Sequence, residues 1–145
     1  MHEPNNFLDK QLCFLFYVSS KEIIKRYTPH LKKYGLTYTG YIVLLAIEDD
    51  ESINIKSLGE RLYLDSGTLT PMIKKLEKQG LVKRLRQPTD ERNLLVSLTE
   101  EGVNTRHEIS HIAMEVFNDL DISMEDAKTI KSILSKFIVN NFSEA

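Results

Sequence analysis

The chain has a single cysteine, Cys13, whose thiol is the most reactive side chain it offers. With no second cysteine, a disulfide within the chain is excluded. On a helix, Phe16, Tyr17 and Ser20 follow at i+3, i+4 and i+7, on the same side as the thiol. A thiolate stabilised by hydrogen bonds reacts with peroxide to give a sulfenic acid. Most free cysteines are small buried apolar residues, so spacing alone leaves both interpretations open.

Basic side chains gather in the segment 66–98. It has seven basic and three acidic side chains, a net charge of +4, whereas the whole chain carries −2. Positive charge concentrated on one segment of an acidic protein is typical of a surface that binds a polyanion. The alternative is a solvated helix face followed by an ordinary hairpin.

Two other polar groups could bind metal. His107 and His111 have the i, i+4 spacing of two zinc ligands, with Glu108 and Glu115 nearby, but a third clear ligand and a His-Glu-x-x-His order are missing. The acidic run 48–51 lacks the spacing of a calcium loop. We therefore expect solvated surfaces here, with no metal and no cofactor.

Two helices are predicted at residues 55–62 and 66–79, separated by a three-residue break. The second helix begins the basic segment. Asp65 or Ser66 can cap the start of the second helix, and Gly80 can end it in the left-handed conformation. Helix, tight turn, helix is therefore the predicted order. The apolar stripe of the second helix consists of Leu69, Met72, Ile73 and Leu76.

After Gly80 the spacing of the apolar residues changes from that of a helix to every second residue. Residues 81–86 and 93–98 predict strands, joined by a charged turn at 87–92. Two helices and a basic hairpin are the order of a winged helix-turn-helix, whose second helix enters the major groove of DNA while the hairpin contacts the backbone or minor groove. Double-stranded DNA is thus the predicted partner.

We predict DNA contacts on the exposed face of the second helix and on the hairpin. At the hairpin tip, Arg92 is expected to reach DNA while Asp90 holds it through an ion pair. The residues predicted near the groove edge are Ser66, Thr68, Thr70 and Lys74. Those predicted to contact phosphate are Lys75, Lys78, Arg84 and Arg86.

Helical patterns flank this unit. Residues 7–33 form one long pattern, which Pro29 is expected to bend or interrupt. Residues 37–47 predict a largely buried helix. Beyond the hairpin, a helix is expected from 99 to about 117 and a last one from 123 to about 142.

These elements predict a mainly α fold with a small β-hairpin wing. Its parts are an N-terminal helix at 1–34, a winged helix-turn-helix domain at 35–98 and C-terminal helices at 99–145. Because a domain of about 60 residues covers only one side of the terminal helices, we expect a two-fold homodimer built on them. Its two recognition helices would meet successive major grooves of a pseudo-palindromic operator, with half-sites about 10 base pairs apart.

The cell compartment is predicted from what the sequence lacks. No apolar run approaches the roughly 20 residues that span a bilayer, and the start, MHE, lacks the basic region of a signal peptide. Charged residues make up 28% of the chain. We expect a cytoplasmic protein with no membrane contact.

Several motifs resemble those of the MarR family of winged-helix regulators, over nearly the whole chain. They are LGERL at 58–62, SGTLT at 66–70, LEKQGLV at 76–82, DERN at 90–93 and LTEEG at 98–102. Within that family, QLCF at 11–14, Tyr17, Tyr27 and TYTGY at 37–41 resemble the one-cysteine OhrR branch of thiol-based peroxide sensors.

The resemblance implies a redox switch. In it, Tyr27 and Tyr38 would donate hydrogen bonds to Cys13, with Tyr17 and Ser20 nearby. Oxidation of Cys13 by an organic peroxide would break these contacts, rotate the winged domains and release the operator. The sulfenate would then pass to a low-molecular-weight thiol as a mixed disulfide, or be overoxidised.

Two other functions stay open. One is a MarR-type regulator that responds to a small aromatic ligand bound between its domains, with Cys13 merely packed. The other is a thiol peroxidase with Cys13 as nucleophile. Against an enzyme, no histidine or arginine follows Cys13 closely, and the sequence has no glycine-rich phosphate loop or nucleophile elbow. We therefore predict that the protein is not an enzyme.

Overall fold

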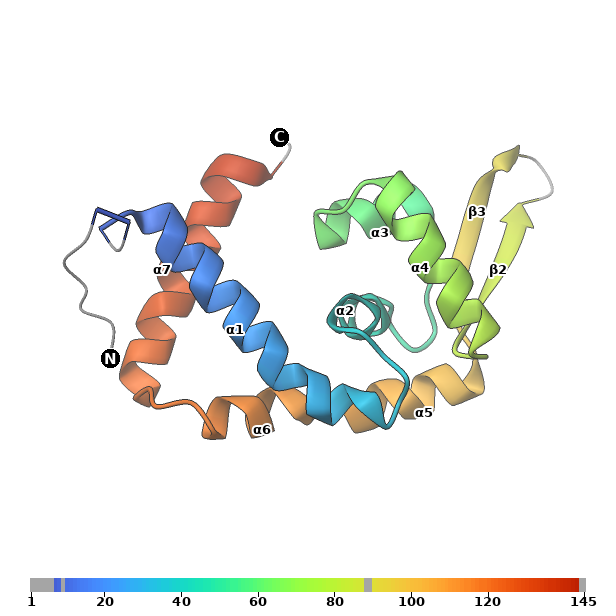
Figure 1. Ribbon diagram of the computed structural model, residues 1–145. Helices are drawn as coiled ribbons and strands as arrows, with labels where there is room; N and C mark the ends of the chain where they lie inside the picture. Colours follow the sequence, from blue (N-terminus) through green and yellow to red (C-terminus); the bar gives the residue numbers. More distant parts are fainter. Residues whose placement is uncertain (1–6, 9, 88–89, 144–145) are drawn as a thin grey trace.

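The computed structural model describes residues 7–8, 10–87 and 90–143, with the side chains of 87 and 90–93 left aside. The described chain is mainly helical, with one small antiparallel sheet (Figure 1). The helices are α1 (Leu12–Lys32), α2 (Tyr38–Ala46), α3 (Ile55–Leu62), α4 (Ser66–Lys78), α5 (Glu100–Ile109), α6 (Ile112–Asn118) and α7 (Met124–Phe142). The strands are β1 (Ser52–Asn54), β2 (Val82–Gln87) and β3 (Asp90–Leu98).

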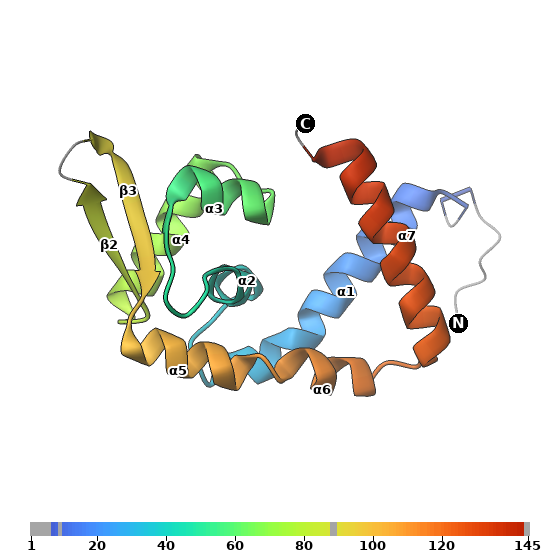
Figure 2. The same cartoon turned by 180° about the vertical axis from the view of Figure 1, so that it is seen from behind.

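The elements form two groups joined by α5 and α6. At one end, α2, α3, α4 and the sheet pack into a winged unit; at the other, α1 and α7 cross (Figure 1). The view from behind shows the same division, with α5 and α6 running along the base (Figure 2). The C-terminal part of α1 packs on α2 and α6 and so connects the groups.

The hydrophobic core lies in the winged unit and at the base. Residues that are almost fully buried come from every element of that unit, including Leu44 of α2, Leu58 of α3, Ile73 of α4 and Val96 of β3. Leu31 of α1 and Ile109 of α5 complete it from the base. By contrast, α7 has no buried residue in the single chain.

The predicted helix-turn-helix is confirmed nearly to the residue. The Asp65 carboxylate accepts from the Thr68 N–H at 2.7 Å and caps α4, and Gly80 has the left-handed φ of +79° predicted for the helix end. In the turn, Tyr63 is left-handed, with φ 58°, and the Leu64 N–H donates to the Gly59 carbonyl at 2.9 Å. The turn fixes how α4 leaves α3.

The hairpin is also confirmed, but the sheet contains a third strand that the sequence did not predict. The order is β1-β3-β2, with Ile53 opposite Val96 and Lys83 opposite Ser97. Three residues are too few for an alternating pattern, so β1 becomes visible only through its pairing with β3.

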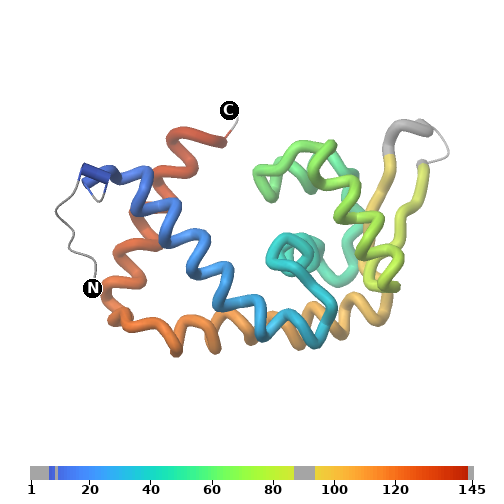
Figure 3. Tube along the Cα trace, viewed as in Figure 1, coloured from blue at the N-terminus to red at the C-terminus, as the bar shows by residue number. Residues whose placement is uncertain are grey.

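Of the two effects expected of Pro29, the structure excludes an interruption, and the helix predicted from 99 to 117 was wrong in detail. Pro29 does not interrupt α1, which continues to Lys32 as one helix (Figure 3). The last turn is held by Leu31, which is 1% exposed, and by the packing of Tyr27 on α2. The helix predicted from 99 to 117 is broken into α5 and α6, where the Ser110 hydroxyl donates to the His107 carbonyl at 2.7 Å.

The acidic turn after α2 does more than face solvent. Arg61 of α3 makes a two-pronged ion pair with Glu51 at 2.7 and 3.0 Å, and this lowers the pKa of Glu51. Arg106 of α5 donates to Asp49 at 3.1 Å, and His107 lies 2.9 Å from the same carboxylate. The turn therefore ties the helix-turn-helix to α5.

Gly59 predicts a sharp test of the turn. A Cβ there would lie 2.5 Å from the Leu64 carbonyl oxygen, so Gly59→Ala must displace the backbone that orients α4. We expect it to lower the free energy of unfolding by about 1–3 kcal/mol in chemical denaturation. Gly40→Ala is the matched control, since its Cβ would meet only side chains at 3.4 Å or more. Equal stability of the two variants would contradict this account of the turn.

Candidate nucleic-acid interface and cysteine site

The exposed side of α4 carries the residues predicted to meet DNA. Leu69, Ile73 and Leu76 are buried against the unit, and the lysines point away from it. Thr70 is half-buried, and its hydroxyl donates to the Ser66 carbonyl at 2.7 Å, which leaves it mainly an acceptor. The exposed members of the predicted set are Ser66, Thr68, Lys74, Lys75 and Lys78.

The wing divides the predicted phosphate contacts into two kinds. Arg86 is exposed on β2, as a phosphate contact requires. Arg84, two residues earlier on the same face of the strand, turns instead to α4, where its Nη2 lies 2.9 Å from Glu77 Oε1. Asp90 and Arg92 lie in β3, but their side chains are outside the described part of the structure.

Cys13 is exposed near the start of α1, as are Tyr17 and Ser20. Phe16, on the adjoining side of the helix, stacks on Phe137 of α7 with ring centroids 5.7 Å apart. The thiol therefore sits beside the place where α1 and α7 touch. In the single chain it is open to solvent.

Tyr27 and Tyr38 are brought together, along with Tyr41, which the sequence reasoning missed. The Tyr27 ring lies 5.0 Å from that of Tyr38 and 5.2 Å from that of Tyr41. Burial raises the pKa of Tyr38 and Tyr41, and the neighbouring Tyr27 raises both further. The spacing of Tyr38 and Tyr41, one turn apart on a helix, was the available signal.

The tyrosine cluster and the thiol lie at opposite ends of α1. Cys13 and Tyr27 are fourteen positions apart on one continuous helix, which at 1.5 Å per residue is about 21 Å. Tyr27 therefore cannot contact Cys13 within one chain. Tyr38 and Tyr41 share the position of Tyr27 and are equally remote.

The outer surfaces of α1 and α7 are apolar and uncovered. Ile133 is 62% exposed and Leu12 is 63% exposed, whereas leucine and isoleucine in a hydrophobic core are buried. The uncovered residues of these two helices include Leu12, Leu15, Ile23, Ile24, Ile130, Ile133, Phe137, Ile138 and Val139.

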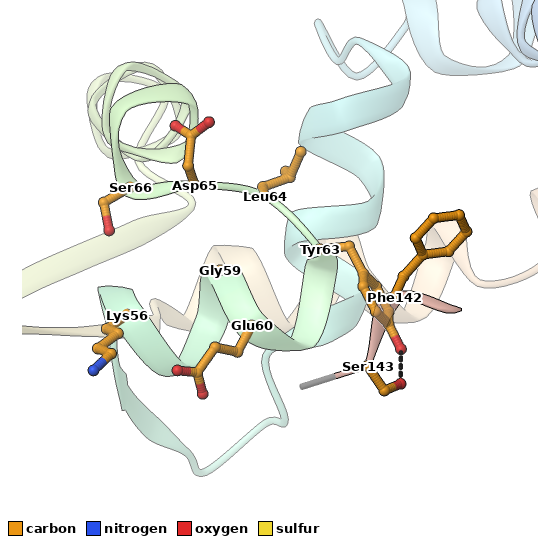
Figure 4. Close-up of a pocket in the computed structure, with 9 residues that line it drawn as sticks. All are labelled: Lys56, Gly59, Glu60, Tyr63, Leu64, Asp65, Ser66, Phe142 and Ser143. Atoms are coloured by element: carbon orange, nitrogen blue, oxygen red, sulfur yellow. Dashed lines mark hydrogen bonds between the residues drawn. The ribbon is translucent and has the colours of Figure 1, made fainter. Parts of the chain in front are cut away.

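A cleft of about 890 Å³ lies between the helix-turn-helix and the end of α7. Figure 4 shows Tyr63 beside Phe142 and Ser143, with the Tyr63 hydroxyl 3.2 Å from the Ser143 hydroxyl. Lys56, Glu60 and Asp65 give the rest of the lining a charged character. All three are exposed, so the cleft is an open surface rather than an enclosed apolar pocket.

Among the described residues, no group of three or more His, Cys, Asp or Glu side chains is placed to hold a metal ion. His107 is instead paired with Asp49. In the same part of the chain, no helix is long and apolar enough to cross a membrane.

Comparison with known proteins gives the family. The model of the family "Transcriptional regulator SarA/Rot" matches residues 25–109. The regulator SarZ of Staphylococcus epidermidis is 59% identical over 142 residues, covering 98% of this chain and 96% of that protein. The chain belongs to the SarA/Rot family of transcriptional regulators. SarZ of Staphylococcus aureus is 58% identical with the same coverage.

Solved structures confirm the MarR-type winged-helix fold of this family member. Reduced AbfR bound to DNA has a TM-score of 0.75 and 33% identity, covering 92% of this chain and 93% of that one. Overoxidised AbfR bound to DNA has a TM-score of 0.72 and 34% identity, with the same coverage. Apo MarR of Escherichia coli has a TM-score of 0.67 and 25% identity, covering 88% of this chain and 97% of that one. The resemblance to the MarR family is therefore confirmed.

The tyrosine cluster predicts a distinctive titration. Because burial favours the neutral phenol, Tyr38 and Tyr41 should ionise above the ordinary tyrosine pKa of about 10. The cluster stabilises the folded state fully below pH 10, and this contribution is lost as the pH rises through the raised values. Ultraviolet absorbance should show that Tyr41→Phe removes an ionisation step that lies above the ordinary tyrosine range. Loss of an ordinary step in Tyr41→Phe would contradict the assignment.

Proposed function

We propose that this regulator is a redox sensor whose homodimer binds a pseudo-palindromic operator and releases it when Cys13 is oxidised by peroxide. The observation that carries the proposal is the position of Cys13, which is exposed on an apolar helix surface that a second chain would cover. A modification there acts directly on the packing between subunits.

DNA binding is supported by the exposed basic side of α4 and by the wing beside it. Ser66, Thr68, Thr70 and Lys74 would meet the groove. The phosphate backbone would be met by Lys75, Lys78, Arg86 and Arg92, with Asp90 holding Arg92. AbfR, of the same fold and a third identical, is bound to DNA in its solved structures, which supports the same partner here.

A homodimer follows from the uncovered faces of α1 and α7. Each apolar residue removed from water contributes roughly 25 cal/mol per Å² of buried apolar area, so a second copy of these helices is the natural cover. In this proposal, residues 1–34 and 99–145 form the dimer interface and residues 35–98 bind DNA.

The dimer would also bring the tyrosines to the thiol. Tyr27 is about 21 Å from Cys13 along its own helix, so only a second chain can supply the contact. If two α1 helices pack antiparallel, the start of one lies over the end of the other. Cys13 then faces the partner subunit's Tyr27 and Tyr38.

The chemistry balances with peroxide and a small thiol as reactants. The Cys13 thiolate attacks the terminal hydroxyl oxygen of an organic hydroperoxide and the O–O bond breaks, which gives the sulfenic acid and an alkoxide. The alkoxide takes a proton from water and leaves as the alcohol. A low-molecular-weight thiol then displaces the sulfenic hydroxyl as water and forms a mixed disulfide. Cysteine is oxidised and peroxide is reduced.

The mixed disulfide should be the stronger signal, since it inserts a bulky group between packed helices. AbfR has been solved on DNA in its overoxidised form, so added oxygen atoms need not clear the operator. A difference of roughly 3 kcal/mol between the two arrangements of the dimer would change affinity about 150-fold. Strain at a close-packed interface is of that order.

The dimer is tested by Ile133→Glu, which places a charge on the uncovered face of α7. We expect the dimer dissociation constant, measured by analytical ultracentrifugation, to rise at least roughly tenfold because the carboxylate would be buried. Ser132→Glu adds the same group on the polar side of α7 and should leave the dimer intact. A dimer that tolerates both substitutions would exclude this interface.

The contact between chains is tested by the rate of Cys13 oxidation. Tyr27→Phe should slow the reaction with an organic hydroperoxide roughly tenfold, as expected for one lost hydrogen bond worth about 1.4 kcal/mol. Mass spectrometry of quenched samples measures the rate.

Mixed dimers of Tyr27→Phe and Cys13→Ser chains decide which chain supplies the tyrosine. In the mixed dimer, the remaining Cys13 faces an intact Tyr27 across the interface, so the rate should return to that of the unmodified protein. A rate as slow as in the Tyr27→Phe homodimer would show that the tyrosine does not act across the interface.

A further inference from the structure

Arg84 and Glu77 join the recognition helix to the wing. Arg84 Nε lies 3.2 Å and Nη2 2.9 Å from Glu77 Oε1, and the Arg84 backbone N–H donates to Oε2 at 3.3 Å. Both oxygens of one carboxylate on α4 are thus engaged by a single residue of β2. The Arg84 side chain is only 26% exposed.

We infer that Arg84 is a positioning residue, which sets the angle of the wing against α4 through Glu77 and does not itself bind phosphate. This inference rests on the proposed DNA-binding function. It separates Arg84 from Arg86, which is exposed on the same face of β2 and for which we keep the role of a phosphate contact.

The geometry of the strand supports this role. β2 is an edge strand, since the sheet order is β1-β3-β2, so alternate N–H groups point away from the sheet. Glu77 takes one of these N–H groups as well as the side chain of the same residue. The pair therefore fixes both the position and the rotation of β2 where it leaves α4.

The charges argue against a phosphate contact. The Arg84 guanidinium lowers the pKa of Glu77, so this carboxylate is ionised at neutral pH. If Arg84 left for a phosphate, the ionised Glu77 carboxylate would lose this partner beside a polyanion, which costs free energy. As an ion pair, Glu77 and Arg84 have no net charge together. The pair holds the wing in a fixed position relative to the lysines of α4.

Salt dependence of DNA binding tests the inference. A protein loses about 0.9 in the slope of log K against log salt for each phosphate contact removed. The probe is a fluorescent duplex selected by the unmodified protein from a random-sequence pool. The variants are Arg84→Gln, Glu77→Gln, both together, and Arg86→Gln as the matched control.

We expect Arg84→Gln to weaken binding roughly three- to thirtyfold with an unchanged slope. In the Glu77→Gln background the same change should have little further effect, because the pair is already broken. Arg86→Gln should lower the slope. Arg84→Lys, which keeps the charge but not the two-pronged contact, should weaken binding with an unchanged slope and serves if Arg84→Gln does not fold.

Three results would overturn the inference. They are a slope lowered in Arg84→Gln as in Arg86→Gln, an equal loss in both backgrounds, and unchanged affinity. A variant that is merely less stable would have a lower melting temperature, but its folded protein would bind DNA with unchanged affinity. That outcome counts against the inference. Failure of the unmodified protein to select or bind any duplex would instead refute the proposed DNA-binding function.

Discussion

The apolar faces of α1 and α7 must be covered by something other than water, and the rest of the account depends on that constraint. The winged unit buries its own core, whereas α7 buries no residue in the single chain. Cys13 lies on the same uncovered surface, next to the stacking of Phe16 on Phe137. The surface that would hold two subunits together is therefore also the surface that oxidation would alter.

The elements of the winged unit, in contrast, are tied to one another by several specific contacts. Gly59 allows the turn to close, Asp65 caps α4, and Arg61 and Arg106 tie the acidic turn to α3 and α5. The Glu77–Arg84 pair adds the wing to this body. A shift at the α1–α7 end would then reach the recognition helix as a rigid rotation, carried by α5 and α6 along the base (Figures 1 and 2).

Much of this fold could be predicted from sequence because its signals are local. The start and end of α4 are marked by Asp65 and Gly80, its buried face is marked by an apolar stripe, and the hairpin strands are marked by apolar residues at every second position. The features that were missed depend on distant partners. β1 forms only by pairing with β3, Tyr41 packs on Tyr27 of another helix, and the ion pair of Arg84 depends on Glu77 of α4. The thiol's own partners were named through family resemblance, and one chain alone does not bring them together.

The most direct test of the central claim is the distance between the two winged units in the dimer. A spin label built in as a genetically encoded amino acid at Glu60, which is exposed on α3, reports that distance by pulsed electron resonance without using Cys13. Reduced protein should give one distance, unchanged on adding DNA, because its recognition helices already match grooves about 34 Å apart. Converting Cys13 to a mixed disulfide should shift the distance and abolish DNA binding together. Loss of binding with an unchanged distance would contradict the account.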